Sequence, residues 1–511
     1  MAIEIGIGIP RIEIRSSPLQ SDQALVRIAG GAVLLFGATF FGLGLNYFYA
    51  VVLARILGPE QFGLYSLGLG CFALLSVIGL AGLDTAILRF VPALRAQSDG
   101  DGVGRSIRAA LVLASGLSIV FAAVLLCGAD SIANRLFHNN EASSVLSVFA
   151  LSIPFLVVST VSLAALQAFR EVRWRTFVKY VCEPVVKVAV TLGLVWWGWG
   201  LMAALLALPV ALGLTAVLAL LPLRRILPKG SESASSNRAY RDVFYYSLPL
   251  LGGLIFNALA TRSDVLLLGY WSSMEEVGVY SAAFQTSAIM ALMLGTLESI
   301  ATPFLSESIS KNDPREIRSL TGTTLRWTVT GTLPLCIVMV VFAKDIMGLF
   351  GSHFETGAIC LIILAIGQFF YSATGCSHGM LLWAGHSKLV MWNSLVAAAA
   401  QIGLYLLLIP SYGIIGAAVA TAASLILTLI LRTIQVRYLL NIWPFDYTIY
   451  KPLAAGVMAS LFTITIRSIP FFSHSAVLLV VFILFYIGFI FAFGLHKDDR
   501  AVLLQLKQRV S

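Results

Sequence analysis

Charged side chains inside apolar stretches are the residues of this sequence best suited to chemistry. Arg262 and Asp264 lie in the apolar run 243–270, shortly after Asn257 and Thr261. A guanidinium binds phosphate oxygens well, and a charge at membrane depth is costly unless it has a function. At about 100° per residue, Asn257, Thr261 and Asp264 share one helix face, and Arg262 points nearly the opposite way. We predict a substrate-binding stripe of the three, with Arg262 either contacting phosphate or extending to the outer surface.

Four other charged residues also fall inside apolar runs. Asp84 and Glu298 lie at nearly the same depth in two separate runs. They are predicted either to hold a coupling cation or proton at an inner mouth, or to serve helix packing. Glu183 and Lys187 are spaced four apart, in the order that favours an ion pair on a helix. That pair is predicted to be mutually neutralised, with contact to sugar or phosphate as the alternative.

The elements that carry these residues are membrane helices. Apolar residues make up 59% of the 511 residues, charged residues only 12%, and the mean hydropathy is +0.90. About 20 apolar residues are needed to cross a bilayer as a helix. Fourteen runs meet this need, at about 28–53, 62–91, 106–127, 145–169, 176–197, 199–221, 243–270, 277–305, 325–343, 357–383, 389–409, 414–438, 450–468 and 475–495. The sequence therefore predicts an all-α polytopic membrane protein.

The distribution of basic residues sets the orientation of these spans. With the N-terminus inside, 28 of the 34 Lys and Arg fall on the inner side and only 4 on the outer side. Such a bias is typical of inner loops and predicts that both termini are cytoplasmic. The net charge of +9 therefore reflects topology, and no nucleic-acid partner is predicted.

Motifs for covalent chemistry are missing from the sequence. The six cysteines form no CxxC pair, the histidines form no HExxH, and no Gly-Lys dipeptide could make a phosphate-binding loop. We predict no catalytic residues, no metal site and no cofactor. The protein is therefore not expected to be an enzyme.

A repeat divides the chain into two halves. The motif Glu60, Gly63, Tyr65, Ser66 recurs as Glu275, Gly278, Tyr280, Ser281, and Leu57-Gly58 recurs as Leu268-Gly269. Gly42 and Asn46 recur as Gly253 and Asn257. Six spans per repeat return the chain to the same side, so the halves run parallel, as in transporters with a substrate path between halves. The paired Asn46 and Asn257 are predicted to join helices or to bind sugar hydroxyls.

The repeat predicts the domain organisation. A cytoplasmic tail (1–23) comes first, followed by an N-terminal lobe (24–221) and a basic, Ser-rich cytoplasmic linker (222–242). A C-terminal lobe (243–440), two appended spans (441–496) and a second cytoplasmic tail (497–511) complete the predicted organisation.

At these motifs the chain resembles a known family. The stretches LARILGPEQFGLYSLG and GLAGLDTAILRF (79–90), with SDVLLLGYW and EVGVYSAAFQ in the second half, resemble bacterial O-antigen and exopolysaccharide flippases of the multidrug/oligosaccharidyl-lipid/polysaccharide exporter superfamily. The resemblance implies V-shaped lobes that alternate access and move undecaprenyl-pyrophosphate-linked oligosaccharides across the bacterial inner membrane. It also implies membrane lipids and polysaccharide polymerase or chain-length proteins as partners.

Two alternatives stay open. A cation-coupled drug exporter or a lipid II flippase of the same superfamily would share the fold, although two added spans favour a lipid-linked substrate. A membrane glycosyltransferase or polymerase is a third possibility, which the short outer loops and the internal duplication disfavour.

Overall fold

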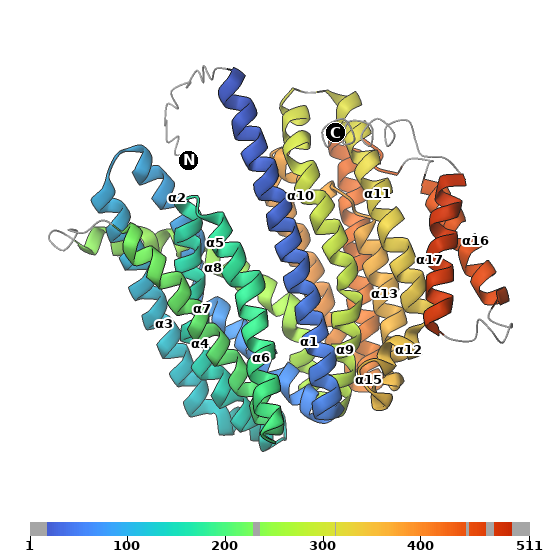
Figure 1. The fold of residues 1–511 in the computed structure, drawn as a ribbon, viewed down its shortest axis with the longest axis horizontal. Helices are drawn as coiled ribbons and strands as arrows, with labels where there is room; N and C mark the ends of the chain where they lie inside the picture. Colours follow the sequence, from blue (N-terminus) through green and yellow to red (C-terminus); the bar gives the residue numbers. More distant parts are fainter. Residues whose placement is uncertain (1–17, 228–235, 312, 446–448, 467–474, 493–511) are drawn as a thin grey trace.

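The protein is helical throughout the part of the chain that the structure describes. The computed structural model describes residues 18–227, 236–311, 313–445, 449–466 and 475–492 (Figure 1). Nine helical stretches in these residues are long and apolar enough to cross a membrane. The predicted all-α polytopic fold is confirmed. Most of the predicted linker lies within the described residues, but the two predicted tails lie largely or wholly outside them.

The helices follow the chain in two successive sets. The first set is α1 (Pro18–Leu80), α2 (Leu83–Ala96), α3 (Gly100–Arg135), α4 (Glu141–Ala168), α5 (Val172–Phe177), η1 (Val178–Cys182), α6 (Glu183–Trp196) and α7 (Gly200–Ile226). The second set is α8 (Ser236–Trp271), α9 (Met274–Ser287), α10 (Ile289–Ser310), α11 (Pro314–Val341), α12 (Ala343–Gly348), η2 (Ser352–Gly357), α13 (Ala358–Ser372), α14 (Ser377–Trp383) and α15 (Ser387–Leu440). Two last helices, α16 (Tyr450–Ile466) and α17 (Ser475–Ala492), follow.

Within the described residues the fourteen predicted spans fall on helices, and several of them comprise two consecutive helices, such as α9 and α10 for the span at 277–305. Two long stretches each contain two spans that a glycine separates. Gly58 interrupts α1 with φ 74° and ψ 174°, directly before Pro59, which has no N–H for the helix ladder, and Gly413 interrupts α15 with φ 53° and ψ −131°. Only glycine adopts such angles cheaply. Gly200 precedes Gly413 by 213 residues, close to the offsets of 211 and 215 at which the other motifs repeat, and it also has a positive φ, of 48°.

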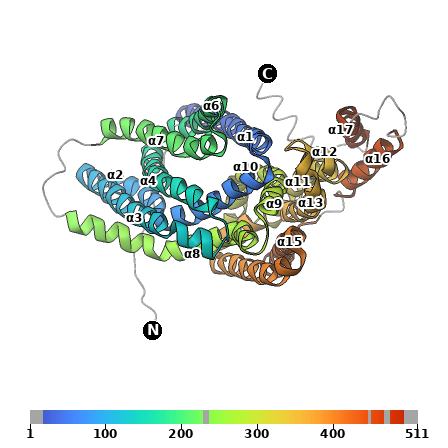
Figure 2. The ribbon, with the colours of Figure 1, turned by 90° about the horizontal axis from the view of Figure 1, so that it is seen from below.

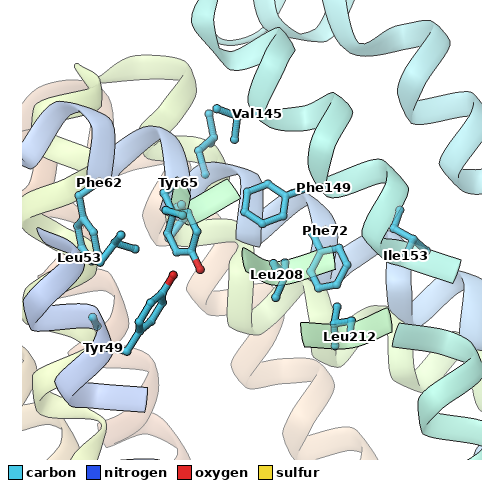
Figure 3. Close-up of a cluster of buried hydrophobic side chains, with 14 of the residues drawn as sticks. Tyr49, Leu53, Phe62, Tyr65, Phe72, Val145, Phe149, Ile153, Leu208 and Leu212 are labelled. Carbon is cyan, nitrogen blue, oxygen red and sulfur yellow. The ribbon is translucent and has the colours of Figure 1, made fainter. Parts of the chain in front are cut away.

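Two lobes make up the molecule. In Figure 1, α2–α7 form the group on the left and α9–α15 the group on the right, and the two diverge toward the top. The N-terminal lobe has a large core between α1, α4 and α7, in which Tyr65 lies 5.6 Å from Phe149 between ring centroids (Figure 3). Gly68 makes room for this core, because a Cβ there would lie 2.4 Å from the Phe149 ring.

The two appended spans lie at the outer edge of the C-terminal lobe (Figure 2). There α16 packs against α11 and α17. Tyr486 of α17 donates to the Thr330 carbonyl of α11 at 2.9 Å, and Leu333 packs among the apolar residues of both appended helices. They contact the lobe through α11 and Phe369 of α13, as expected for an addition to a duplicated core.

Helix α8 joins the two lobes. It packs against α2 and α3 of the first lobe and against α1, α9 and α15. Near its beginning, Tyr246 lies under the Arg89 guanidinium at 4.4 Å and 5.6 Å from the Phe90 ring. The predicted lobe boundary at residue 243 therefore separates the two copies of the repeat, but the helix that follows it, α8, packs against both lobes.

The duplicated corners cross each other. A Cβ on Gly63 would lie 1.8 Å from the Met274 carbonyl oxygen and 3.0 Å from the Gly278 nitrogen. A Cβ on Gly278 would lie 2.0 Å from the Pro59 carbonyl oxygen. The matched glycines thus let the backbones of α1 and α9 touch, as small residues do between membrane helices. The repeat motif is a lobe-to-lobe contact on the side predicted to be outside.

Candidate functional site

A cavity of about 320 Å³ lies where the two copies of the repeat meet. Its walls come from α1, α8, α9 and the beginning of α10. The polar residues that line it are Asn46, Tyr47, Ser66, Arg262, Asp264, Ser281 and Gln285. The cavity is therefore a polar site between lobes, next to the crossing of Gly63 and Gly278.

Arg262 and Asp264 both line this cavity. Arg262 is exposed, whereas Asp264 is only 2% exposed. Helix periodicity directs the two residues to nearly opposite sides of α8, yet both reach the same cavity. Asn257 and Thr261 are exposed on α8 away from the cavity, and Thr261 donates to the Asn257 carbonyl at 3.0 Å. The predicted stripe of Asn257, Thr261 and Asp264 is therefore not a common wall of this site.

Asp264 is held by a hydrogen-bonded chain that links three helices. One carboxylate oxygen accepts from the Val265 N–H at 2.7 Å, and the other accepts from the Tyr280 hydroxyl at 3.1 Å. The Tyr280 and Tyr405 hydroxyls lie 3.1 and 2.7 Å from that of Thr421. Because these residues belong to α8, α9 and α15, the chain fixes one wall of the cavity to the C-terminal lobe.

A second cation reaches the cavity through Asn46. Lys187 of α6 donates to the Asn46 side-chain oxygen at 2.7 Å and lies 4.7 Å above the Tyr49 ring. The Asn46 side-chain nitrogen donates to the Gly42 carbonyl at 2.8 Å. Lys187 thus orients an amide that lines the cavity without lining it itself.

The expected Glu183–Lys187 pair does not form. Glu183 instead accepts from Lys179 at 2.9 Å, across the wide π-helical turn Val178–Cys182. Gly42 explains the change of partner: a Cβ there would lie 2.3 Å from the Tyr180 carbonyl oxygen, so α1 lies close enough for Lys187 to reach Asn46. Asn46 thus joins α1 to α6 within the N-terminal lobe. Gly253, which the repeat matches to Gly42, has no such close neighbour, because a Cβ there would have no atom within 4 Å.

Two serines of the repeat motif line the same cavity and were not among the predicted site residues. Ser66 and Ser281 line the cavity and are 7% and 4% exposed. Neither hydroxyl has a hydrogen-bond partner among the described residues. Buried hydroxyls usually have partners, so each is available to a ligand. The signal was present in the sequence, as the Tyr-Ser pair that occurs in both motifs.

Asp84 and Glu298 belong to separate surroundings. Asp84 is half-buried in the first turn of α2, where the helix dipole favours a carboxylate, and α2 packs against α3, α4 and α8. Glu298 lies on α10 beside α14, and a Cβ on Gly379 of α14 would lie 3.7 Å from the Glu298 carboxylate. The carboxylate also interacts electrostatically with Arg432 of α15. Their equal depth in matched helices does not bring them into one cluster.

Within the described part of the chain, no group of three or more His, Cys, Asp or Glu is placed to hold a metal ion. The six cysteines are free thiols. The polar groups that the fold does bring together in the cavity are a guanidinium, three hydroxyls, two amides and a carboxylate. This donor set can bind an anionic, hydroxylated solute.

Two duplicated helical lobes around a central polar cavity define a membrane transporter fold, and solved structures share it. The lipid II flippase MurJ in an inward closed conformation matches 90% of this chain and 98% of its own, with a TM-score of 0.73 and 16% identity. An inward-facing multidrug resistance transporter of the MATE family matches 80% of this chain and 97% of its own, with a TM-score of 0.64 and 14% identity.

The chain belongs to the family described as "Polysaccharide biosynthesis protein", whose profile matches residues 52–357. Its relatives include the probable low-salt glycan biosynthesis flippase Agl15 of Haloferax volcanii, 24% identical over 79% of this chain and 82% of that protein. The succinoglycan biosynthesis transport protein ExoT of Rhizobium meliloti is 24% identical over 76% of this chain and 75% of that protein. The resemblance seen in the sequence is confirmed.

Proposed function

We propose that this protein moves lipid-linked oligosaccharides across the bacterial inner membrane for polysaccharide biosynthesis, by alternating access between its lobes. The observation that carries the proposal is the cavity between the lobes, where Arg262 lies among unpartnered serine hydroxyls. The names of Agl15 and ExoT, a flippase and a transport protein of glycan biosynthesis, support the substrate class. No covalent step is needed, so the protein acts as a transporter and not as an enzyme.

Arg262 binds the pyrophosphate that joins lipid and sugar. Its planar, permanent charge suits phosphate oxygens. Ser66, Ser281 and Asn46 supply hydrogen bonds to the phosphate or the first sugar, and Lys187 orients Asn46. A cavity of about 320 Å³ is at the lower end of the range for small-molecule sites, so it holds the linkage rather than the whole oligosaccharide.

Alternating access breaks the contacts on the outer side. Besides the crossing of Gly63 and Gly278, Arg55 donates to the Leu349 carbonyl at 2.5 Å, and Phe62 lies 6.0 Å from the Phe354 ring. The lobes diverge at the other end, toward the top of Figure 1. In the proposed cycle the substrate enters from this inner side, and release requires the outer contacts to part. Asp84 and Glu298 are the candidates for coupling this change to a cation or proton.

A lipid II flippase is the second candidate, and the extent of the structural match favours it over a drug exporter. The match to MurJ covers 90% of this chain, against 80% for the MATE transporter. The difference is similar in size to α16, α17 and their connections. Both candidates keep both termini in the cytoplasm, and a polysaccharide polymerase or chain-length protein is a proposed partner of the first.

Deletion of the gene tests the proposed substrate. We expect the lipid-linked oligosaccharide to accumulate on the cytoplasmic face and surface polysaccharide to be lost, because the proposed carrier of the sugar is then missing. The measurement is the amount of lipid-linked intermediate, together with surface polysaccharide. Normal export accompanied by new drug sensitivity would replace the proposal with drug export.

Removal of both cavity hydroxyls tests the site. In Ser66→Ala/Ser281→Ala we expect transport to fall by about five- to 150-fold, because two donors worth about 0.5–1.5 kcal/mol each are lost to the ligand. Thermal stability should not fall, because neither hydroxyl has a partner among the described residues. Ser162→Ala, which removes another buried, unpartnered hydroxyl in α4, is the matched control. Unchanged transport in the double variant would remove the serines from the site.

A further inference from the structure

A second and larger cavity lies far from the site between the lobes. It encloses about 900 Å³ between the first turns of α11 and the segment that follows α15. Three of its lining residues are arginines, Arg315, Arg318 and Arg326. By the predicted orientation, this end of α11 is at the cytoplasmic surface of the membrane.

The three arginines share one face of α11. Arg315, Arg318, Gly322 and Arg326 follow one another at spacings of three and four, which places them along one side of a helix. Gly322 opens this face, because a Cβ there would lie 3.5 Å from an Arg326 guanidinium nitrogen. Arg315 and Arg318 are exposed at the mouth, whereas Arg326 is only 6% exposed and donates to the Thr323 hydroxyl at 3.0 Å. The positive charge therefore continues from the surface into the protein.

The opposite wall is aromatic. Asn441, with φ 54°, ends α15 and turns the chain so that Trp443 and Phe445 follow, with ring centroids 5.7 Å apart. Both line the cavity, and Trp443 is 52% exposed. Tryptophan is enriched at the level of the lipid headgroups, where its ring is half in the apolar and half in the polar layer. The cavity therefore lies at the membrane–water boundary.

No carboxylate lines this cavity in the part of the chain that the structure describes. The nearby Asp313 side chain is used at the start of α11, where it accepts from the Arg315 and Glu316 N–H groups at 3.0 and 3.2 Å. Arg315 and Arg318, two guanidiniums at the mouth with no acid lining the described wall, repel each other and attract an anion. Arg315 and Arg318 make no side-chain hydrogen bond or ion pair with any described residue, so both are available to a ligand.

We propose that this cavity binds the headgroup of an anionic phospholipid of the inner leaflet. Phosphate oxygens would meet the guanidiniums, and the acyl chains would leave past Trp443 and Phe445 into the bilayer. Basic pockets at the cytoplasmic ends of membrane helices bind such headgroups. The lipid would join α11 to the connection between α15 and α16 and so hold the appended helices to the lobe. This inference depends on the membrane fold and orientation, not on the transported substrate.

Thermal unfolding of the full chain in neutral detergent tests the site. Phosphatidylglycerol is titrated into the purified protein, with phosphatidylcholine and inorganic phosphate in parallel. We expect phosphatidylglycerol alone to stabilise it. In Arg315→Gln/Arg318→Gln, the concentration for half-maximal stabilisation should rise by about tenfold or more, since each contact near the surface contributes appreciably to binding. This variant leaves the buried Arg326 in place, so folding is preserved.

Arg224→Gln/Arg225→Gln is the matched control. These two exposed arginines end α7 on the same side of the membrane and lie outside the cavity. Unchanged affinity in this control, beside weaker binding in Arg315→Gln/Arg318→Gln, supports the site. Equal weakening in both variants would show non-specific attraction to basic loops, and equal stabilisation by inorganic phosphate would show a site for the free anion. Either result would overturn the proposal.

Discussion

Replacing Gly63 by alanine is expected to reduce transport by about five- to 150-fold. The new Cβ would lie 1.8 Å from the Met274 carbonyl oxygen, and both atoms belong to helix backbones that cannot move without separating α1 from α9. Overpacking of this kind costs about 1–3 kcal/mol. A cost of that size shifts the equilibrium between two conformations by about five- to 150-fold. The outer-closed state should become rare, and the transport cycle needs that state. The rate of substrate movement in membrane vesicles measures the effect.

Gly44→Ala is the control for Gly63→Ala. Gly44 lies on the same helix, and a Cβ there has no atom within 4 Å. Alanine is a better helix former than glycine by about 1 kcal/mol, so this control should keep its stability and its transport. Gly278→Ala, whose Cβ would lie 2.0 Å from the Pro59 carbonyl oxygen, should behave as Gly63→Ala does. Full transport in both would mean that the crossing of the two corners is not part of the cycle.

Replacing Arg262 by alanine is expected to abolish surface polysaccharide while the protein still inserts in the membrane. Arg262 is the cation that lines the cavity directly among the described residues. A hydrogen bond to a charged group contributes about 1.5–3 kcal/mol, so binding of a pyrophosphate should weaken by about ten- to 150-fold. Arg262→Lys should restore transport only in part, because an ammonium cannot form the paired contact. Surface polysaccharide and protein content of the membrane are both measured.

Arg135→Ala controls for the loss of one positive charge. Arg135 is exposed at the end of α3, at the outer end of the N-terminal lobe and outside the cavity. Its removal should leave surface polysaccharide unchanged. Normal export by Arg262→Ala would exclude Arg262 from substrate binding and with it the proposed phosphate contact.

Features set by local sequence could be predicted from the sequence. The apolar runs predicted the all-α polytopic fold, which the long apolar helices confirm. The repeat of Gly63 as Gly278 identified matched corners, but only the structure shows that they touch. Contact between two distant parts of a chain depends on how the lobes pack, and that packing cannot be read from the local pattern of a single sequence.

The site was predicted in part. Arg262, Asp264 and Asn46 were recognised because charge and symmetry mark them, whereas Ser66 and Ser281 look like ordinary small residues of a helix. Asn257 does not line the cavity that Asp264 lines, since helix periodicity gives directions around one helix but not the positions of its neighbours. The partner of Lys187 depended on the close approach of α1 at Gly42, which a spacing of four residues cannot show.

Transport by the purified protein in liposomes is the most direct test of the proposed function. A polyprenyl-pyrophosphate-linked oligosaccharide is placed in the inner leaflet, and a membrane-impermeant glycosidase is added outside. With the wild-type protein we predict that the glycosidase cleaves the sugar. In liposomes with Arg262→Ala we predict no more cleavage than in liposomes without protein. Equal accessibility in empty and protein-containing liposomes would contradict the proposal that this chain moves lipid-linked oligosaccharides.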